Sequence, residues 1–150
     1  MIVHEKGTYI LILQLQSATR LAIGRLGTFD FAAGWYAYVG SAFGPGGLSG
    51  RLKHHLAPVK KPHWHIDYLR VVASLREVWF LASDVIYEHR WAASLHVLPT
   101  ASILVPRFGA SDCKCDSHLI YFPQQPHIAT FNHLGDWHVQ QWQIDTPLHR

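Results

Sequence analysis

Arg51 and His55 are the first pair of residues whose types and spacing could do chemistry. They lie four positions apart in a segment, 50–56, that predicts a helix capped by Ser49 and stopped by Pro58. At that spacing the two side chains share one helical face. A guanidinium binds phosphate oxygens through paired planar donors, and an imidazole serves as a donor or a base near neutral pH. Taken alone, however, the pair is more simply interpreted as an exposed polar face.

Two tyrosines stand where predicted strands begin and end. Tyr9 follows Gly7-Thr8, and Tyr38 precedes Val39-Gly40. Tyrosines on neighbouring strands usually serve packing in the core or across the strands. Their spacing by itself therefore favours a structural role over a functional one.

Glu88 is a carboxylate at the expected edge of the core. It falls on a predicted helix, 85–95, capped by Asp84, in one stripe with Ala92 and Leu95 that should face inward. A carboxylate there needs a cation, hydrogen-bond donors or a metal. Placement at the positive end of the helix dipole explains it equally well.

Cys113, Cys115 and His118 could bind zinc, because two thiols and an imidazole lie within six residues. A structural zinc site usually has four ligands, however, and the chain has no second cysteine pair. We therefore expect buried structural cysteines and a purified protein without stoichiometric zinc.

The scaffold that must position these residues is predicted from apolar runs and turn signals. Strands are predicted at 9–15, 21–23, 35–40, 77–82 and 119–122, and helices at 50–56, 64–72 and 85–95. Short connections between the first three strands suggest an antiparallel meander. The last 25 residues show only weak helical spacing.

Length and charge narrow the class of protein. The 150 residues fit one domain, and the 49% hydrophobic content is enough for a compact core. No apolar run reaches membrane-spanning length. The first residues turn polar before any apolar stretch of a secretory signal, so we expect a cytoplasmic protein. The net charge is +3, and positive residues gather in 51–76, which fits a polyanionic partner or an ordinary solvated face.

These residues together resemble the GIY-YIG nuclease superfamily. Gly7-Thr8-Tyr9 and Tyr38-Val39-Gly40 are similar to its two signature tripeptides, Arg51 and His55 to its Arg-x-x-x-His helix, and Glu88 to its metal-binding glutamate. Further stretches resemble one subgroup of small stand-alone GIY-YIG-like proteins whose function is not established: 38–42, 46–48, 61–69 and 108–113. In some archaea the domain of this subgroup is attached to a DNA-repair glycosylase of the endonuclease-three kind. The resemblance covers a domain at 5–123 and leaves 124–150 as an extension of unknown role.

The resemblance implies an α+β fold, a small antiparallel sheet flanked by helices, and hydrolysis of a nucleic-acid phosphodiester, DNA rather than RNA, in DNA repair. Glu88 would hold Mg²⁺ (or Mn²⁺), and Arg51 would bind the phosphate. Tyr9 would act as general base or orient the attacking water, His55 is the alternative base, and Tyr38 would position these groups. The nucleic acid would also contact basic residues around Arg51: Lys53, Lys60 and Lys61.

Two departures from the superfamily pattern bear on activity. The loop Gly44–Gly47 is long, and no asparagine can be placed after the glutamate. One alternative is an inactive nucleic-acid-binding domain of the same fold. Another is a zinc-stabilised protein-interaction domain centred on Cys113, Cys115 and His118.

Overall fold

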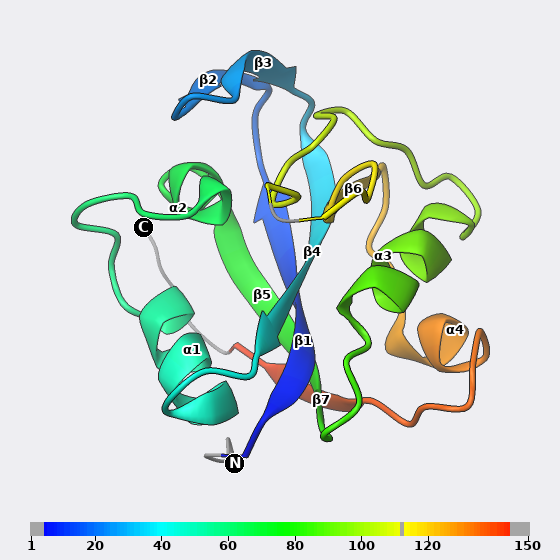
Figure 1. Cartoon of the computed structure of the whole chain (residues 1–150). Coiled ribbons are helices and arrows are strands. Elements are labelled where there is room, and N and C mark those ends of the chain that lie inside the picture. The colour runs from blue at the N-terminus through cyan, green and yellow to red at the C-terminus, as the bar shows by residue number, and fades with distance from the viewer. Residues whose placement is uncertain (1–4, 112, 145–150) are drawn as a thin grey trace.

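The chain folds around one long antiparallel sheet, as the computed structural model shows for residues 5–111 and 113–144 (Figure 1). The strands of the whole chain, in this sheet and in a separate hairpin, are β1 (Gly7–Leu15), β2 (Thr19–Ile23), β3 (Gly27–Phe31), β4 (Gly34–Ala42), β5 (Ser74–Ala82), β6 (Leu119–Phe122) and β7 (Gln140–Gln143). Its helices are α1 (Gly47–Leu56), α2 (His65–Arg70), α3 (Glu88–His96) and α4 (Ile128–Asn132). No helix in these described residues is long and apolar enough to cross a membrane.

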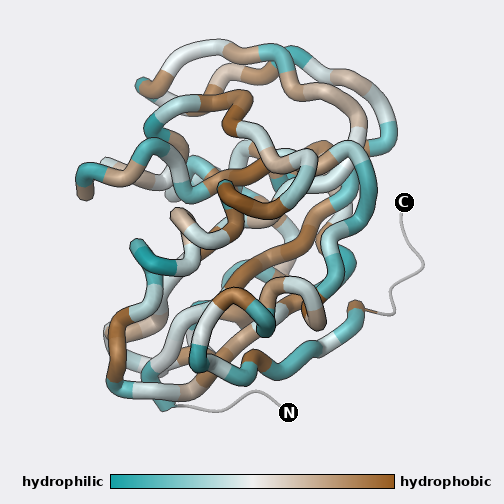
Figure 2. Tube along the Cα trace, turned by 90° about the vertical axis from the view of Figure 1, so that its right-hand side faces the viewer, coloured by the Kyte–Doolittle hydropathy of each residue, from teal (hydrophilic) through white to brown (hydrophobic). Residues whose placement is uncertain are grey.

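β1 is the central strand of the main sheet, whose order is β6-β4-β1-β5-β7 with every neighbouring pair antiparallel. Its sequence, GTYILILQL, is almost continuously apolar because both of its faces are covered. Tyr9, Leu11 and Leu13 point into one hydrophobic cluster, while Ile10 and Ile12 point into the other. Figure 2 shows long hydrophobic stretches crossing the middle of the trace.

The helices form one layer on each face of the sheet (Figure 1). α1 and α2 supply Leu48, Leu52, Ile66 and Leu69 to the cluster that contains Tyr9. α3 and α4 supply Trp91, Ala92, Leu95 and Phe131 to the cluster on the opposite face. The predicted class, an α+β domain with a small antiparallel sheet flanked by helices, is therefore confirmed.

The predicted meander of the first three strands is wrong. β2 and β3 pair only with each other, as a separate two-stranded sheet. Both strands alternate between half-buried and exposed residues, so they suit a one-sided hairpin rather than the doubly covered centre of the sheet. β1 is thus left to pair with β4 and, across a long connection, with β5.

Two predicted helix starts also differ from the structure. α1 begins at Gly47 after Gly46, whose φ of 88° suits glycine, so Ser49 lies inside the helix. α3 begins at Glu88, so Asp84 is not its cap. In the segment before α3, two hydroxyls accept backbone hydrogen bonds: the N–H of Val85 donates to Ser83 Oγ, and the N–H of Tyr87 donates to Thr8 Oγ1.

The segment beyond residue 123 continues the fold within its described part. α4 packs Phe131 against Trp79 and Trp91 in the second cluster. β7 pairs with β5 and forms one edge of the main sheet. Its sequence, QQWQ, has too few apolar residues to reveal a strand by pattern.

Candidate active site

Tyr9 on β1 and His55 on α1 form the centre of the candidate site. The Tyr9 hydroxyl lies 2.7 Å from His55 Nε2, and both side chains are buried. Burial lowers the pKa of His55 to about 3, helped by the charges of Arg70 and His54. Burial also raises the pKa of Tyr9 well above its ordinary value, and Arg51 opposes that shift without cancelling it. At neutral pH the pair is therefore an uncharged phenol beside an uncharged imidazole.

The position opposite Tyr9 on β4 must be a glycine, and it is Gly40. The two residues are direct partners in the β1–β4 register. A Cβ added at Gly40 would lie 2.4 Å from the Tyr9 ring and hydroxyl oxygen. The tyrosine ring therefore rests on bare backbone, and this close approach directs its hydroxyl toward His55.

Arg51 lies beside the same pair. Its guanidinium stacks over the Trp64 ring, 4.6 Å from the ring centroid. Its positive charge lowers the pKa of both Tyr9 and Tyr38 against the larger effect of burial, so it acts on both hydroxyls. Trp64, just before α2, is a site residue that the sequence did not reveal, because nothing in its local pattern links it to α1.

Tyr38 lies between the Tyr9–His55 pair and the loop that precedes β6. Its ring meets both Phe108 and His55 edge-on, at 6.0 Å and 6.4 Å between ring centroids. Gly109 makes room for it, since a Cβ there would lie 2.9 Å from the Tyr38 ring. Burial first, and then the charge of Glu88, raise the pKa of Tyr38.

Glu88 lies in the first turn of α3 with its side chain 22% exposed, rather than deep in a core-facing stripe. Its Oε2 is 3.2 Å from His118 Nδ1, which is an ion-pair distance, although the two atoms do not meet the geometry of a hydrogen bond. Burial alone would raise the pKa of Glu88, but His118, His89 and Ser41 outweigh it and lower the pKa. The predicted need for a partner is met by His118, and Glu88 in turn raises the pKa of this histidine against the effect of burial.

The structure thus brings all five predicted site residues into one region. The negative charge of Glu88 raises the pKa of Tyr9 and of Tyr38, so the carboxylate lies within electrostatic reach of both hydroxyls. Arg51 and His55 approach from the opposite helix layer. A phenol, a neutral imidazole, a guanidinium and a carboxylate together can bind a phosphate, orient water and hold a cation.

The basic residues of segment 51–76 differ in whether they are exposed or already hydrogen-bonded within the protein. Lys53, Lys60 and Lys61 are exposed and free to meet a partner, whereas Arg51 is half-buried. Arg70 is occupied, because it donates to the carbonyl oxygen of Ala57 at 2.6 Å. The predicted nucleic-acid residues therefore lie on α1 and on the loop that follows it.

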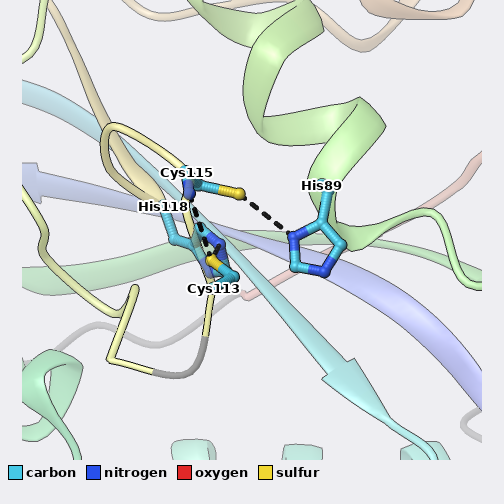
Figure 3. Close-up of side chains that lie close together, drawn as sticks. All are labelled: His89, Cys113, Cys115 and His118. Atoms are coloured by element: carbon cyan, nitrogen blue, oxygen red, sulfur yellow. Dashed lines mark hydrogen bonds between the residues drawn. The ribbon is translucent and has the colours of Figure 1, made fainter.

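Two groups of potential metal ligands occur among the described residues, and neither includes Glu88. His54, His55 and Asp67 form the first, but Asp67 already accepts hydrogen bonds from the backbone N–H groups of His63 and Trp64. The second consists of His89, Cys113, Cys115 and His118 (Figure 3). The cysteines are half-buried rather than buried as predicted. His89 was missed because it lies far from the cysteines in sequence and on another element.

The molecule is an α+β domain with one polar site, and the residues of that site come from β1, β4, α1 and α3. The DUF123 family, described as a domain of unknown function, matches residues 8–145. The chain therefore belongs to the DUF123 family. None of the curated proteins and none of the solved structures compared with it matches the chain.

Proposed function

We propose that the protein is a metal-dependent endonuclease of the GIY-YIG kind that hydrolyses nucleic-acid phosphodiesters, DNA rather than RNA, in the cytoplasm. The observation that supports this most is the buried 2.7 Å contact between Tyr9 and His55, flanked by Arg51 and within the field of Glu88. Simple packing of a tyrosine does not need a histidine, an arginine and a carboxylate around its hydroxyl.

Glu88 fits a hard divalent cation. Its lowered pKa keeps it anionic at neutral pH, and its side chain is partly accessible. Mg²⁺ is commonly held by one or two carboxylates and keeps several waters, so a single glutamate is enough. When bound, the metal stabilises negative charge on the scissile phosphate and on the leaving oxygen.

Arg51 binds the non-bridging phosphate oxygens in this proposal. Its stacking on Trp64 fixes the plane of the guanidinium, which reduces the entropy lost when it forms paired hydrogen bonds with phosphate. As charge builds up in the transition state, this contact strengthens.

Tyr9 orients the attacking water rather than acting as a free phenolate, because its pKa is raised. We assign its O–H as the donor to His55 Nε2, which places the single proton of the neutral imidazole on Nδ1. The lone pairs of the Tyr9 oxygen can then accept a hydrogen bond from water. A bound phosphate brings negative charge that favours proton movement from water through Tyr9 toward His55.

The test is cleavage by Glu88→Gln, which removes the anionic ligand at nearly constant volume. Wild type and variant are incubated with Mg²⁺ or Mn²⁺ on single-stranded, duplex, flap and branched DNA. We expect wild type to cut at least one substrate and the variant to lose cleavage while it keeps its fold and its DNA affinity. Asp84→Asn, at an exposed carboxylate before α3, is the matched control and should cut like wild type.

Two results would contradict the proposal. Equal cleavage by Glu88→Gln would remove Glu88 as the metal ligand. A wild type that binds all of these DNA substrates and cuts none would favour the inactive nucleic-acid-binding domain instead.

A further inference from the structure

Four side chains with soft or borderline ligand atoms converge where the loop before β6 meets the first turn of α3 (Figure 3). Cys113 and Cys115 come from the loop, His118 from its end, and His89 from the helix. Their ligand atoms all lie within 4.8 Å of one another. His89 Nδ1 is 3.0 Å from Cys115 Sγ, and Cys113 Sγ is 3.3 Å from His118 Nε2.

We propose that these four side chains bind one structural Zn²⁺. Zinc takes thiolate sulfur at about 2.3 Å and imidazole nitrogen at about 2.0 Å in a tetrahedral shell, so neighbouring ligand atoms lie about 3.3 to 3.8 Å apart. The separations between ligand atoms in the structure run from 3.0 Å to at most 4.8 Å, which brackets that range. Small side-chain rotations are therefore enough to form the tetrahedral shell. Two thiolates and two imidazoles are a complete structural zinc set, whereas Mg²⁺ and Ca²⁺ prefer oxygen.

The loop is already shaped to present its sulfur atoms. The guanidinium of Arg107 donates to the carbonyl oxygens of Ala110, Cys113 and Cys115 at 2.5 to 2.6 Å. The backbone N–H of Cys115 also points to Cys113 Sγ at 3.4 Å. These contacts fix the turn between the two cysteines, which reduces the ordering that a metal must impose.

Glu88 supplies the outer contact that a zinc-bound histidine usually has. Such a histidine commonly turns its second ring nitrogen to a carboxylate, which fixes the ring orientation. His118 directs Nε2 toward Cys113 and Nδ1 toward Glu88 Oε2, 3.2 Å away. This arrangement explains a buried nitrogen that has no well-aligned hydrogen bond among the described residues.

The sequence predicts no zinc because it shows only three ligands close together. The structure adds His89 as the fourth. Zinc would fasten the loop that packs on Tyr38 to the helix that carries Glu88. It would therefore act at the edge of the candidate active site without joining the reaction. The zinc assignment does not depend on phosphodiester cleavage, because it rests on the ligand geometry alone.

The test measures zinc in the full chain. Protein purified with reduced thiols is loaded with Zn²⁺, dialysed exhaustively against metal-free buffer and analysed by inductively coupled plasma mass spectrometry. We expect about one equivalent of zinc per chain. Replacement by Co²⁺ should give the visible absorption of a tetrahedral thiolate site. Chelation should lower the melting temperature.

His89→Ala is the decisive variant, because His89 is exposed on α3 and its loss should spare the fold. His96→Ala, at an exposed position on the same helix, is the matched control. We expect His89→Ala to lose most of its zinc on dialysis, as should Cys115→Ser, while His96→Ala keeps it. Circular dichroism checks that each variant is folded. A reduced wild type that retains less than about a fifth of an equivalent overturns the proposal. Equal retention by His89→Ala and His96→Ala also overturns it.

Discussion

His55 should make the stability of the protein depend on pH in a way that one substitution can isolate. In the unfolded chain its pKa is close to 6.5, whereas burial lowers the pKa to about 3 in the folded protein. Below pH 6.5 the unfolded state therefore binds a proton that the folded state does not, and acid favours unfolding. The stability is fully present above pH 6.5 and is lost as pH falls toward 3.

The magnitude follows from this difference in pKa. Each pH unit within the window costs about 1.4 kcal/mol, so the contribution of His55 falls by about 2 kcal/mol at pH 5 and about 3 kcal/mol at pH 4. Because the side chain is only 1% exposed, solvent screening reduces this figure little. Other groups titrate in the same range, so the comparison must be made with a variant that differs only here.

His55→Gln removes the titration and keeps a polar group that can reach the Tyr9 hydroxyl. Urea unfolding followed by tryptophan fluorescence between about pH 7.5 and about pH 4 gives the free energy of unfolding of both proteins. We expect the free-energy difference, wild type minus variant, to fall with acid by the amounts above. His96→Gln, at an exposed histidine, should leave the difference from wild type flat. A flat difference for His55→Gln as well would refute the assignment of a buried, neutral imidazole.

Two further predictions concern the packing of Tyr9 and the basic residues after α1. Gly40→Ala places a methyl group 2.4 Å from Tyr9, so urea unfolding should show a loss of about 1–3 kcal/mol. Gly44→Ala, where a Cβ meets nothing within 4 Å, should change stability by less than about 0.5 kcal/mol; equal losses would contradict the close approach. Lys60→Ala with Lys61→Ala should weaken DNA binding on every sequence. The slope of log affinity against log salt concentration should become shallower by up to about two. Fluorescence anisotropy at several salt concentrations measures this, and an unchanged slope would mean that DNA approaches from another side.

The sequence predicted the elements that have a strong local signal. β1 was predictable because the run 9–15 is rich in strand-forming residues and is too short and too apolar for an isolated amphipathic helix. The pairing of Arg51 with His55 follows from helical spacing alone. The class of fold was likewise accessible, and the five residues of the candidate site were chosen largely through a resemblance of short motifs.

The rest depends on contacts between distant segments. His89 and Cys115 are 26 residues apart and meet only because the loop before β6 runs past the start of α3. Trp64 reaches Arg51 for the same kind of reason. β7 is a strand because β5 offers it an open edge, and its glutamine-rich sequence carries no β pattern. Such features are decided by tertiary packing rather than by local preference.

The strand order has a consequence for how the chain folds during synthesis. The two edge strands of the main sheet, β6 and β7, come from residues 119–143, after the three inner strands, β4, β1 and β5, have been made. Until they emerge, the outer edges of β4 and β5 offer unpaired backbone groups that another nascent chain can pair with. A ribosome that stalls before residue 119 would therefore hold a sheet open on two sides. We expect chaperone binding during synthesis to concentrate on this interval.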